Sequence, residues 1–90
     1  MNTMKSIIQE NRNCLKCGSP YTDLHHVRLG NSSREKCEKW GMVVYICRVH
    51  HRWLHDHPEE KEEIQRLAQR CFEDKYSHDK YMEVFGKNYL

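Results

Sequence analysis

The chain has 90 residues, 38% of them hydrophobic, and a formal charge of +2, so it is short enough to be one domain with a marginal core. No stretch approaches the roughly 18 apolar residues of a membrane span, and residues 1–13 lack the roughly 7–15-residue apolar segment of a secretory signal. We therefore expect a cytoplasmic protein. The charge is uneven: residues 1–57 contain nine Lys and Arg against five Asp and Glu, a net of +4, whereas residues 58–90 contain six against eight, a net of −2.

The first half of the chain alternates short structured pieces with loops. Residues 1–13 are polar and weakly patterned, which indicates a short helix or an arm. Residues 14–18, Cys-Leu-Lys-Cys-Gly, end in the glycine that the tight turn of a zinc knuckle needs. Residues 22–28 are expected to form a first strand. Residues 30–39 contain Gly, Asn and two serines among charged residues, a composition that predicts a loop.

The second half predicts one secure strand followed by helices. Residues 42–46, Met-Val-Val-Tyr-Ile, are β-branched and aromatic, as in a strand. Residues 48–55 predict a helix, and a longer helix is expected to begin at Pro58. A last short helix starting at Ser77 or Asp79 would end at Gly86. The longer helix has one apolar stripe at helical spacing, which consists of Ile64, Leu67, Ala68, Cys71 and Phe72.

Five cysteines without an export signal point to a bound metal, because reducing compartments keep thiols unpaired. Cys14 and Cys17 form a Cys-x2-Cys pair, and Cys47 and His50 form a Cys-x2-His pair. Four such ligands can close a tetrahedral site, so we predict a structural Zn2+ in the ligand layout of a treble-clef finger. His51 is the alternative fourth ligand. Of the remaining cysteines, Cys71 is expected in the core, and Cys37 is expected to be either an exposed thiol or an unpaired cysteine with no role in the site.

Two further pairs of histidines accompany the cysteines. His25 and His26 are adjacent at the end of the first predicted strand, where neighbouring side chains point to opposite faces. His51 and His55 are four residues apart and share one face of the predicted helix. A metal bound against the strands can reach His51 and His55, whereas His25 and His26 need different roles, so one metal and one base can be built here.

These residues, in the order Cys pair, His-His dyad and Ile46-Cys47-x2-His50-His51 before a helix, resemble the HNH endonuclease family over residues 14–55. Within that family the pattern is most similar to small phage-encoded HNH proteins and Ref-like recombination nucleases. The resemblance implies an α+β fold: a small zinc-stapled treble-clef or ββα-metal domain with a C-terminal helix packed on a two-stranded sheet. Residues 1–13 would be an arm or short helix, 14–57 the zinc-stapled core, and 58–90 a helical extension of the same domain.

The resemblance also implies a function, a metal-dependent endonuclease that hydrolyses phosphodiester bonds of nucleic acid, most simply DNA. By position, His26 would be the general base. His25, His51 and His55 would bind one catalytic divalent metal (Mg2+, Mn2+, Ni2+ or Zn2+), which stabilises the charge of the transition state. An imidazole suits the base's role because it can accept a proton from water near neutral pH.

Two basic residues are predicted to bind nucleic acid. Arg28 and Arg52 each lie close in sequence to a site histidine, and contacts of this kind to phosphates weaken as salt rises.

The chain departs from the family at one position, and two other functions stay open. The family's middle Asn would fall near Met42, which cannot make the same hydrogen bond; Asn31 or another residue would have to substitute. A zinc-finger module that binds DNA, RNA or protein without chemistry would need the cysteine pairs only. An inhibitor or adaptor on a degenerate nuclease fold would explain the missing Asn. Specificity can come from a protein partner, and the oligomeric state is open.

Overall fold

The structure, a computed structural model, describes residues 6–30 and 32–90 and has an α+β fold. Strands β1 (Asp23–His26) and β2 (Val43–Ile46) pair antiparallel, with His25 opposite Val44 and His26 opposite Val43. Both strands are shorter than the sequence predicts. The described residues also form four helices, α1 (Arg34–Lys39), α2 (Arg48–His55), α3 (Pro58–Lys75) and α4 (His78–Phe85).

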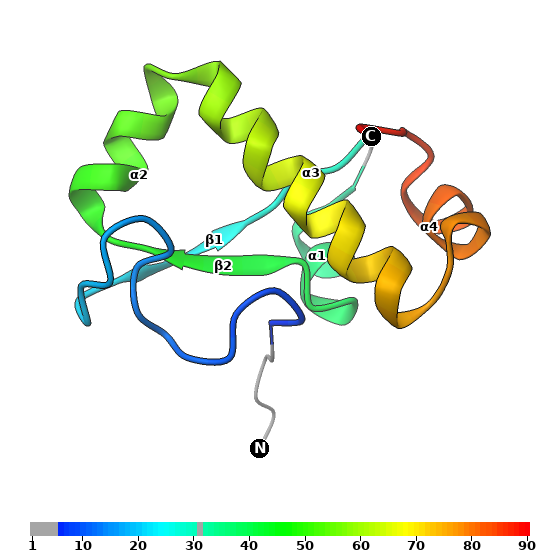
Figure 1. Cartoon of the computed structure of the whole chain (residues 1–90), viewed down its shortest axis with the longest axis horizontal. Helices are drawn as coiled ribbons and strands as arrows, with labels where there is room; N and C mark the ends of the chain where they lie inside the picture. The colour runs from blue at the N-terminus through cyan, green and yellow to red at the C-terminus, as the bar shows by residue number, and fades with distance from the viewer. Residues whose placement is uncertain (1–5, 31) are drawn as a thin grey trace.

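The helices surround the small sheet on several sides (Figure 1). Helix α2 leaves the sheet where β2 ends, and α3 runs back across it in contact with α2. Helix α4 packs beside the C-terminal part of α3, and α1 contacts β1 at the other end of the sheet. This path places the start of α2 beside the N-terminal Cys-x2-Cys loop and the end of β1 beside α1. No helix in the described part of the chain is long and apolar enough to cross a membrane.

One hydrophobic core joins the sheet to the helices. Phe72 of α3 is fully buried, and its ring lies 5.5 Å from Trp40, 5.8 Å from Tyr81 and 5.6 Å from Phe85 between centroids. Such tilted and edge-to-face arrangements are favourable for aromatic pairs. The predicted stripe of α3 therefore faces the core, with Ile64, Ala68 and Phe72 buried and Leu67 and Cys71 half-buried.

The predicted helix boundaries after residue 47 are confirmed. Pro58 stands in the first turn of α3, where a missing backbone N–H costs nothing. Ser77 caps α4 by accepting a hydrogen bond from the Lys80 amide at 3.0 Å. Gly86 ends α4 with φ of 75°, a conformation that glycine adopts without steric cost.

The prediction of a loop over residues 30–39 is wrong at its C-terminal part, which forms α1. Ser33 accepts a hydrogen bond from the Lys36 amide at 3.1 Å and so caps the helix. Cys37 is fully buried, so of its two expected states the exposed thiol is wrong, and it is a free cysteine outside the cluster. Its Sγ donates to the carbonyl oxygen of Val27 at 3.3 Å. Helix α1 has one buried residue and hence no apolar stripe that a sequence pattern would reveal.

The N-terminal segment lies along β2 and contains no helix over residues 6–13. The amide of Ile7 donates to the carbonyl of Gly41 at 3.0 Å, and the amide of Leu15 donates to the carbonyl of Tyr45 at 2.9 Å. The Gln9 side chain accepts from the Tyr45 amide at 2.6 Å. These bonds satisfy backbone groups on the edge of β2 that does not pair with β1.

Candidate functional site

The four predicted zinc ligands come together in one cluster. Cys17 Sγ lies 3.8 Å from Cys47 Sγ, and His50 Nδ1 lies 3.3 Å from Cys47 Sγ and 3.9 Å from Cys14 Sγ. All four ligand atoms lie within 4.8 Å of one another. A tetrahedral ion with metal–sulfur bonds of about 2.3 Å separates its sulfur ligands by about 3.8 Å. The cluster can therefore hold a metal ion, and His50, not His51, completes it.

Local backbone structure builds this cluster from two turns. The Gly18 amide donates to the carbonyl of Cys14 at 2.9 Å, and Gly18 has φ of 80°, as a tight knuckle requires. Cys47 is the N-cap of α2, and His50 lies in the first turn of that helix. Because a residue three positions further along a helix returns to the same face, Cys47 and His50 both turn toward the knuckle.

The two knuckle thiols titrate as a pair. Burial raises the pKa of Cys14, but hydrogen bonds from the amides of Cys47, Cys17 and Lys16 outweigh it and lower that pKa to about 6. The Ser19 amide lowers the pKa of Cys17, whereas burial and the thiols of Cys14 and Cys47 raise it by more. The knuckle thus favours one thiolate before any cation is bound, and a thiolate is the form that binds metal.

A second group of histidines lines a small pocket next to the Cys/His cluster. His25 of β1 meets His51 of α2 edge to face at 5.1 Å between ring centroids, and His51 stacks on His55 at 5.8 Å. Together with Leu54 and Lys61 these histidines line a pocket of about 40 Å³. Among the described residues, the Cys/His cluster is the only set of three or more metal-ligand side chains whose ligand atoms all lie within 4.8 Å. The three histidines thus share one pocket without closing on a common point.

His25 is held in its neutral form. Burial lowers its pKa most, and the nearby positive charges of His51 and Lys61 add to the effect, so that its pKa falls to about 4. A neutral imidazole has a free lone pair on one ring nitrogen. His25 therefore offers a nitrogen ligand at any pH near neutrality.

His26 faces away from that pocket. It is the last residue of β1, and the alternation of a strand turns its side chain to the face opposite His25. Its Nε2 lies 2.9 Å from Oε2 of Glu38 in α1. The His26 side chain is 17% exposed, so it is shielded but still reached by solvent.

The loop between the strands is braced without the family's Asn. Met42 is fully buried and contributes only its backbone: its carbonyl accepts from the Val27 amide at 3.0 Å, and its amide donates to the carbonyl of Cys37 at 2.8 Å. The buried Ser32 hydroxyl accepts from the Leu29 amide at 2.8 Å, and the Cys37 thiol lies 3.6 Å from the same oxygen. Ser32 thus braces this loop through hydrogen bonds to its own backbone. Asn31, the suggested substitute, lies outside the described residues.

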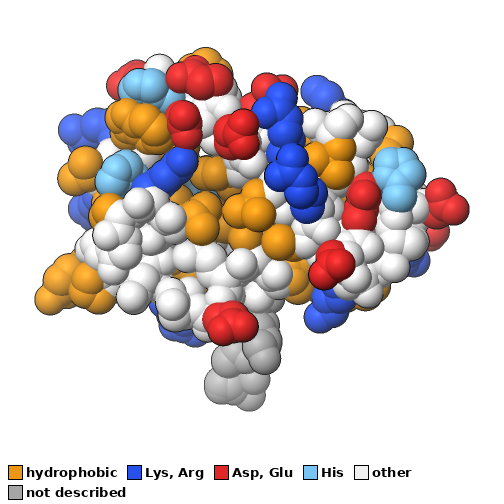
Figure 2. Space-filling model, viewed as in Figure 1, with side chains coloured by type: hydrophobic (Ala, Val, Ile, Leu, Met, Phe, Trp, Pro, Cys, Tyr) orange, Lys and Arg blue, Asp and Glu red, His pale blue; other side chains and the backbone are white. Residues whose placement is uncertain are grey.

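The basic residues around the two sites do not gather into one patch on the face drawn in Figure 2, where acidic and basic side chains are intermixed. Arg28 and Arg52, the predicted phosphate contacts, are both exposed. Arg48 forms an ion pair with Asp23 at 3.4 Å and is itself 90% exposed. Lys61, which the sequence did not single out, is the basic residue that lines the histidine pocket.

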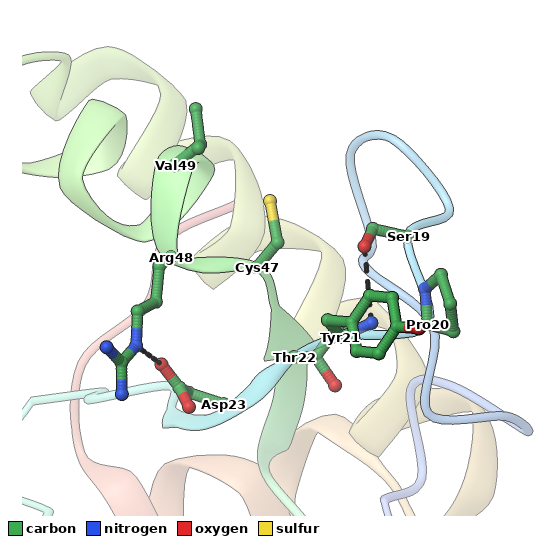
Figure 3. A pocket seen from close by; sticks show the side chains of 8 residues that line it. All are labelled: Ser19, Pro20, Tyr21, Thr22, Asp23, Cys47, Arg48 and Val49. Atoms are coloured by element: carbon green, nitrogen blue, oxygen red, sulfur yellow. Dashed lines mark hydrogen bonds and ion pairs between the residues drawn. The ribbon is translucent and has the colours of Figure 1, made fainter.

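An open groove lies on the other side of Cys47 (Figure 3). Its walls come from the loop before β1 and from the first residues of α2, and Figure 3 shows the Arg48–Asp23 ion pair at its edge. Tyr21 is 84% exposed and Val49 is 74% exposed, so two apolar side chains at this groove lie in solvent.

Two residues of the candidate site escaped sequence reasoning. Glu38 contacts His26 from a helix that the composition did not predict, although Ser33 followed by acidic Glu35 is a helix-start signal. Lys61 lies among the glutamates in the first turns of α3, so the sequence around it forms no basic motif that would single it out.

Comparison of this chain with family models, curated proteins and solved structures found no match. The likeness to HNH endonucleases therefore depends on the residues described above.

Proposed function

We propose that this chain is an HNH-type endonuclease on a zinc-stapled treble-clef scaffold, which hydrolyses DNA phosphodiester bonds with one catalytic divalent metal. The observation that carries the proposal is that His25, His51 and His55 line one pocket, and that His51 directly follows His50 of the Cys/His cluster in α2. Strand β1 and helix α2, the two elements that the HNH pattern uses, supply these residues.

The donors of the two sites differ in kind. Three soft thiolates and one imidazole favour zinc, and four ligands leave no open position, as in a structural site. In the second pocket, imidazoles favour Zn2+ or Ni2+ over Mg2+. His55 is exposed and has room to turn toward His25 and His51 when an ion enters.

The residues divide the reaction between them. Lys61 at the pocket and the exposed Arg52 bind the phosphate by charge. Because His26 faces away from the pocket, the phosphate would have to lie across the end of β1, between the pocket and His26. There His26 takes a proton from water as the water oxygen forms its bond to phosphorus. The bond from phosphorus to the 3′ oxygen breaks, the electron pair stays on that oxygen, and the oxygen takes a proton from solvent. The ion, when bound, supplies positive charge beside the phosphate.

The proposal is tested by plasmid cleavage. Protein loaded with one zinc per chain is incubated with supercoiled DNA and Mg2+, Mn2+, Ni2+ or additional Zn2+, and nicked or linear product is quantified. We expect His26→Ala to lower the nicking rate by at least about 100-fold, because it removes the general base. His78→Ala, which changes an exposed histidine of α4 outside the site, is the matched control and should cleave at the wild-type rate. Wild-type protein as inactive as His26→Ala with every metal would exclude the endonuclease.

A non-catalytic binding module is the second candidate. It is favoured by the Cys/His cluster, which is complete without His25, His51 or His55. The groove beside Cys47, with exposed Tyr21 and Val49, would be its binding surface. In the plasmid experiment this module would retard the DNA on a gel and leave it intact.

A further inference from the structure

The contact between His26 and Glu38 links the proposed base to helix α1. Helix α1 has six residues, of which Cys37 is the buried one. The Cys37 thiol bonds the carbonyl of Val27, the residue directly after β1, which fixes the helix against the end of that strand. Glu38 follows Cys37 and therefore lies beside His26, with its Oε2 2.9 Å from Nε2 of His26.

The Glu38 carboxylate has one ion-pair partner among the described residues, His26. Its side chain is 39% exposed, so the pair lies at the surface of the domain, where a nucleic acid can approach it. A surface pair of this kind adds little to stability, about 0–1 kcal/mol. Fold stability alone does not explain its geometry.

A carboxylate on one ring nitrogen decides what the other nitrogen can do. A neutral imidazole has one N–H and one lone pair. Because a carboxylate only accepts, it fixes the N–H on Nε2 of His26 and leaves the lone pair on Nδ1.

We infer that Glu38 is the positioning residue of the proposed general base: it fixes the tautomer and orientation of His26, so that Nδ1 abstracts the proton from the attacking water. This inference rests on the proposed function and deepens it. It also explains why the apolar Met42 can stand where the HNH pattern has Asn. In this chain the side chain of Glu38, on α1, orients the base.

The first test is kinetic, on supercoiled DNA with zinc-loaded protein. Glu38→Ala is expected to lower kcat by at least about 10-fold with little change in KM, because the base loses its orientation and the substrate contacts remain. Glu38→Gln retains an oxygen that can accept from Nε2 and should recover part of the loss. Glu35→Ala, on the same helix and with the same change of charge, is the matched control and should leave kcat unchanged.

The second test reads the tautomer without any reaction. Nitrogen-15 NMR of histidine-labelled protein, at a pH where the ring is neutral, should show His26 protonated on Nε2 in the wild type and in Glu38→Gln. It should show a mixture of both tautomers in Glu38→Ala, with an unchanged unfolding midpoint.

The outcomes separate the two proposals. An inactive wild type overturns the endonuclease itself. If the wild type is active, the role of Glu38 alone is overturned in either of two cases. One is that Glu38→Ala keeps the wild-type kcat, and the other is that His26 has the same tautomer in the wild type and in Glu38→Ala.

Discussion

At the scale of single residues, protonation of His25 makes the stability of the fold depend on pH. Its pKa of about 4 in the native protein lies below the usual 6.5 because it is buried beside positive charges. Between pH 4 and 6.5 the unfolded chain therefore binds a proton that the native protein does not. The free energy of unfolding rises with pH across this window, and acidification from pH 6.5 to 4 removes stability, up to about 3 kcal/mol from this group.

This dependence is measured by urea unfolding of zinc-loaded protein between pH 4.5 and 7.5. The wild type should lose stability on acidification more steeply than His25→Gln, which cannot take up the proton. His78→Gln, in which the histidine is exposed and paired with Glu73, should follow the wild type. Equal slopes for all three proteins would contradict a buried neutral His25. Each protein carries one zinc, at the Cys/His cluster only, so release of that zinc at low pH is common to the three.

Residue spacing predicted most of the candidate site because its ligands are local pairs. Cys-x2-Cys and Cys-x2-His fix both halves of the cluster, and the spacing from Cys47 selected His50 correctly. The contact of Glu38 with His26 spans 12 residues and depends on how α1 docks, which no spacing encodes.

At the scale of elements, the loop after β1 and the end of α4 depend on each other. A Cβ on Gly30 would collide with the backbone carbonyl oxygen of Phe85, and the φ of Gly30 is 58°. The Tyr89 hydroxyl also accepts from the Gly30 amide at 2.9 Å. The close approach of these two segments therefore requires glycine.

Gly30→Ala tests this contact. It should cost about 1 kcal/mol for the left-handed backbone and about 1–3 kcal/mol more for the collision. Gly86→Ala is the matched control: its φ is 75°, but the nearest atom to a new Cβ is 3.9 Å away, so the backbone term alone applies. Denaturant unfolding measures both. A cost for Gly30→Ala no larger than that for Gly86→Ala would show that the segments do not touch.

Sequence patterns predicted the elements that carry strong periodicity and missed the one that does not. Helices α2, α3 and α4 have clear start or stop residues, and β2 is a β-branched run. Helix α1 is six residues of mostly charged side chains, and its stability comes from the Ser33 cap and from the burial of Cys37. Tertiary contact of that kind overrides a loop-like composition.

At the scale of the whole molecule, the Cys/His cluster joins segments far apart in sequence, Cys14 and Cys17 before the sheet and Cys47 and His50 after it. Ninety residues bury a small core, so an ion held by this cluster should contribute much of the stability. Chelation is expected to unfold the protein, with loss of the helical circular dichroism signal.

Single histidine variants test the assignment of the two sites. His50→Ala should lose the tightly bound zinc and unfold, whereas the neighbouring His51→Ala should keep one zinc per chain and its fold, because His51 faces the other pocket. Metal content after dialysis against a weak chelator, together with circular dichroism, measures this difference. Equal zinc loss in the two variants would contradict the division of roles.

The adjacency of His50 and His51 in α2 couples the geometry of the two sites. Neighbouring residues on a helix are about 100° apart around its axis, so an ion on His50 fixes the rotational phase of α2 and with it the direction of His51. Without an ion at the cluster this constraint on α2 would be lost, so the geometry of the histidine pocket depends on the Cys/His cluster.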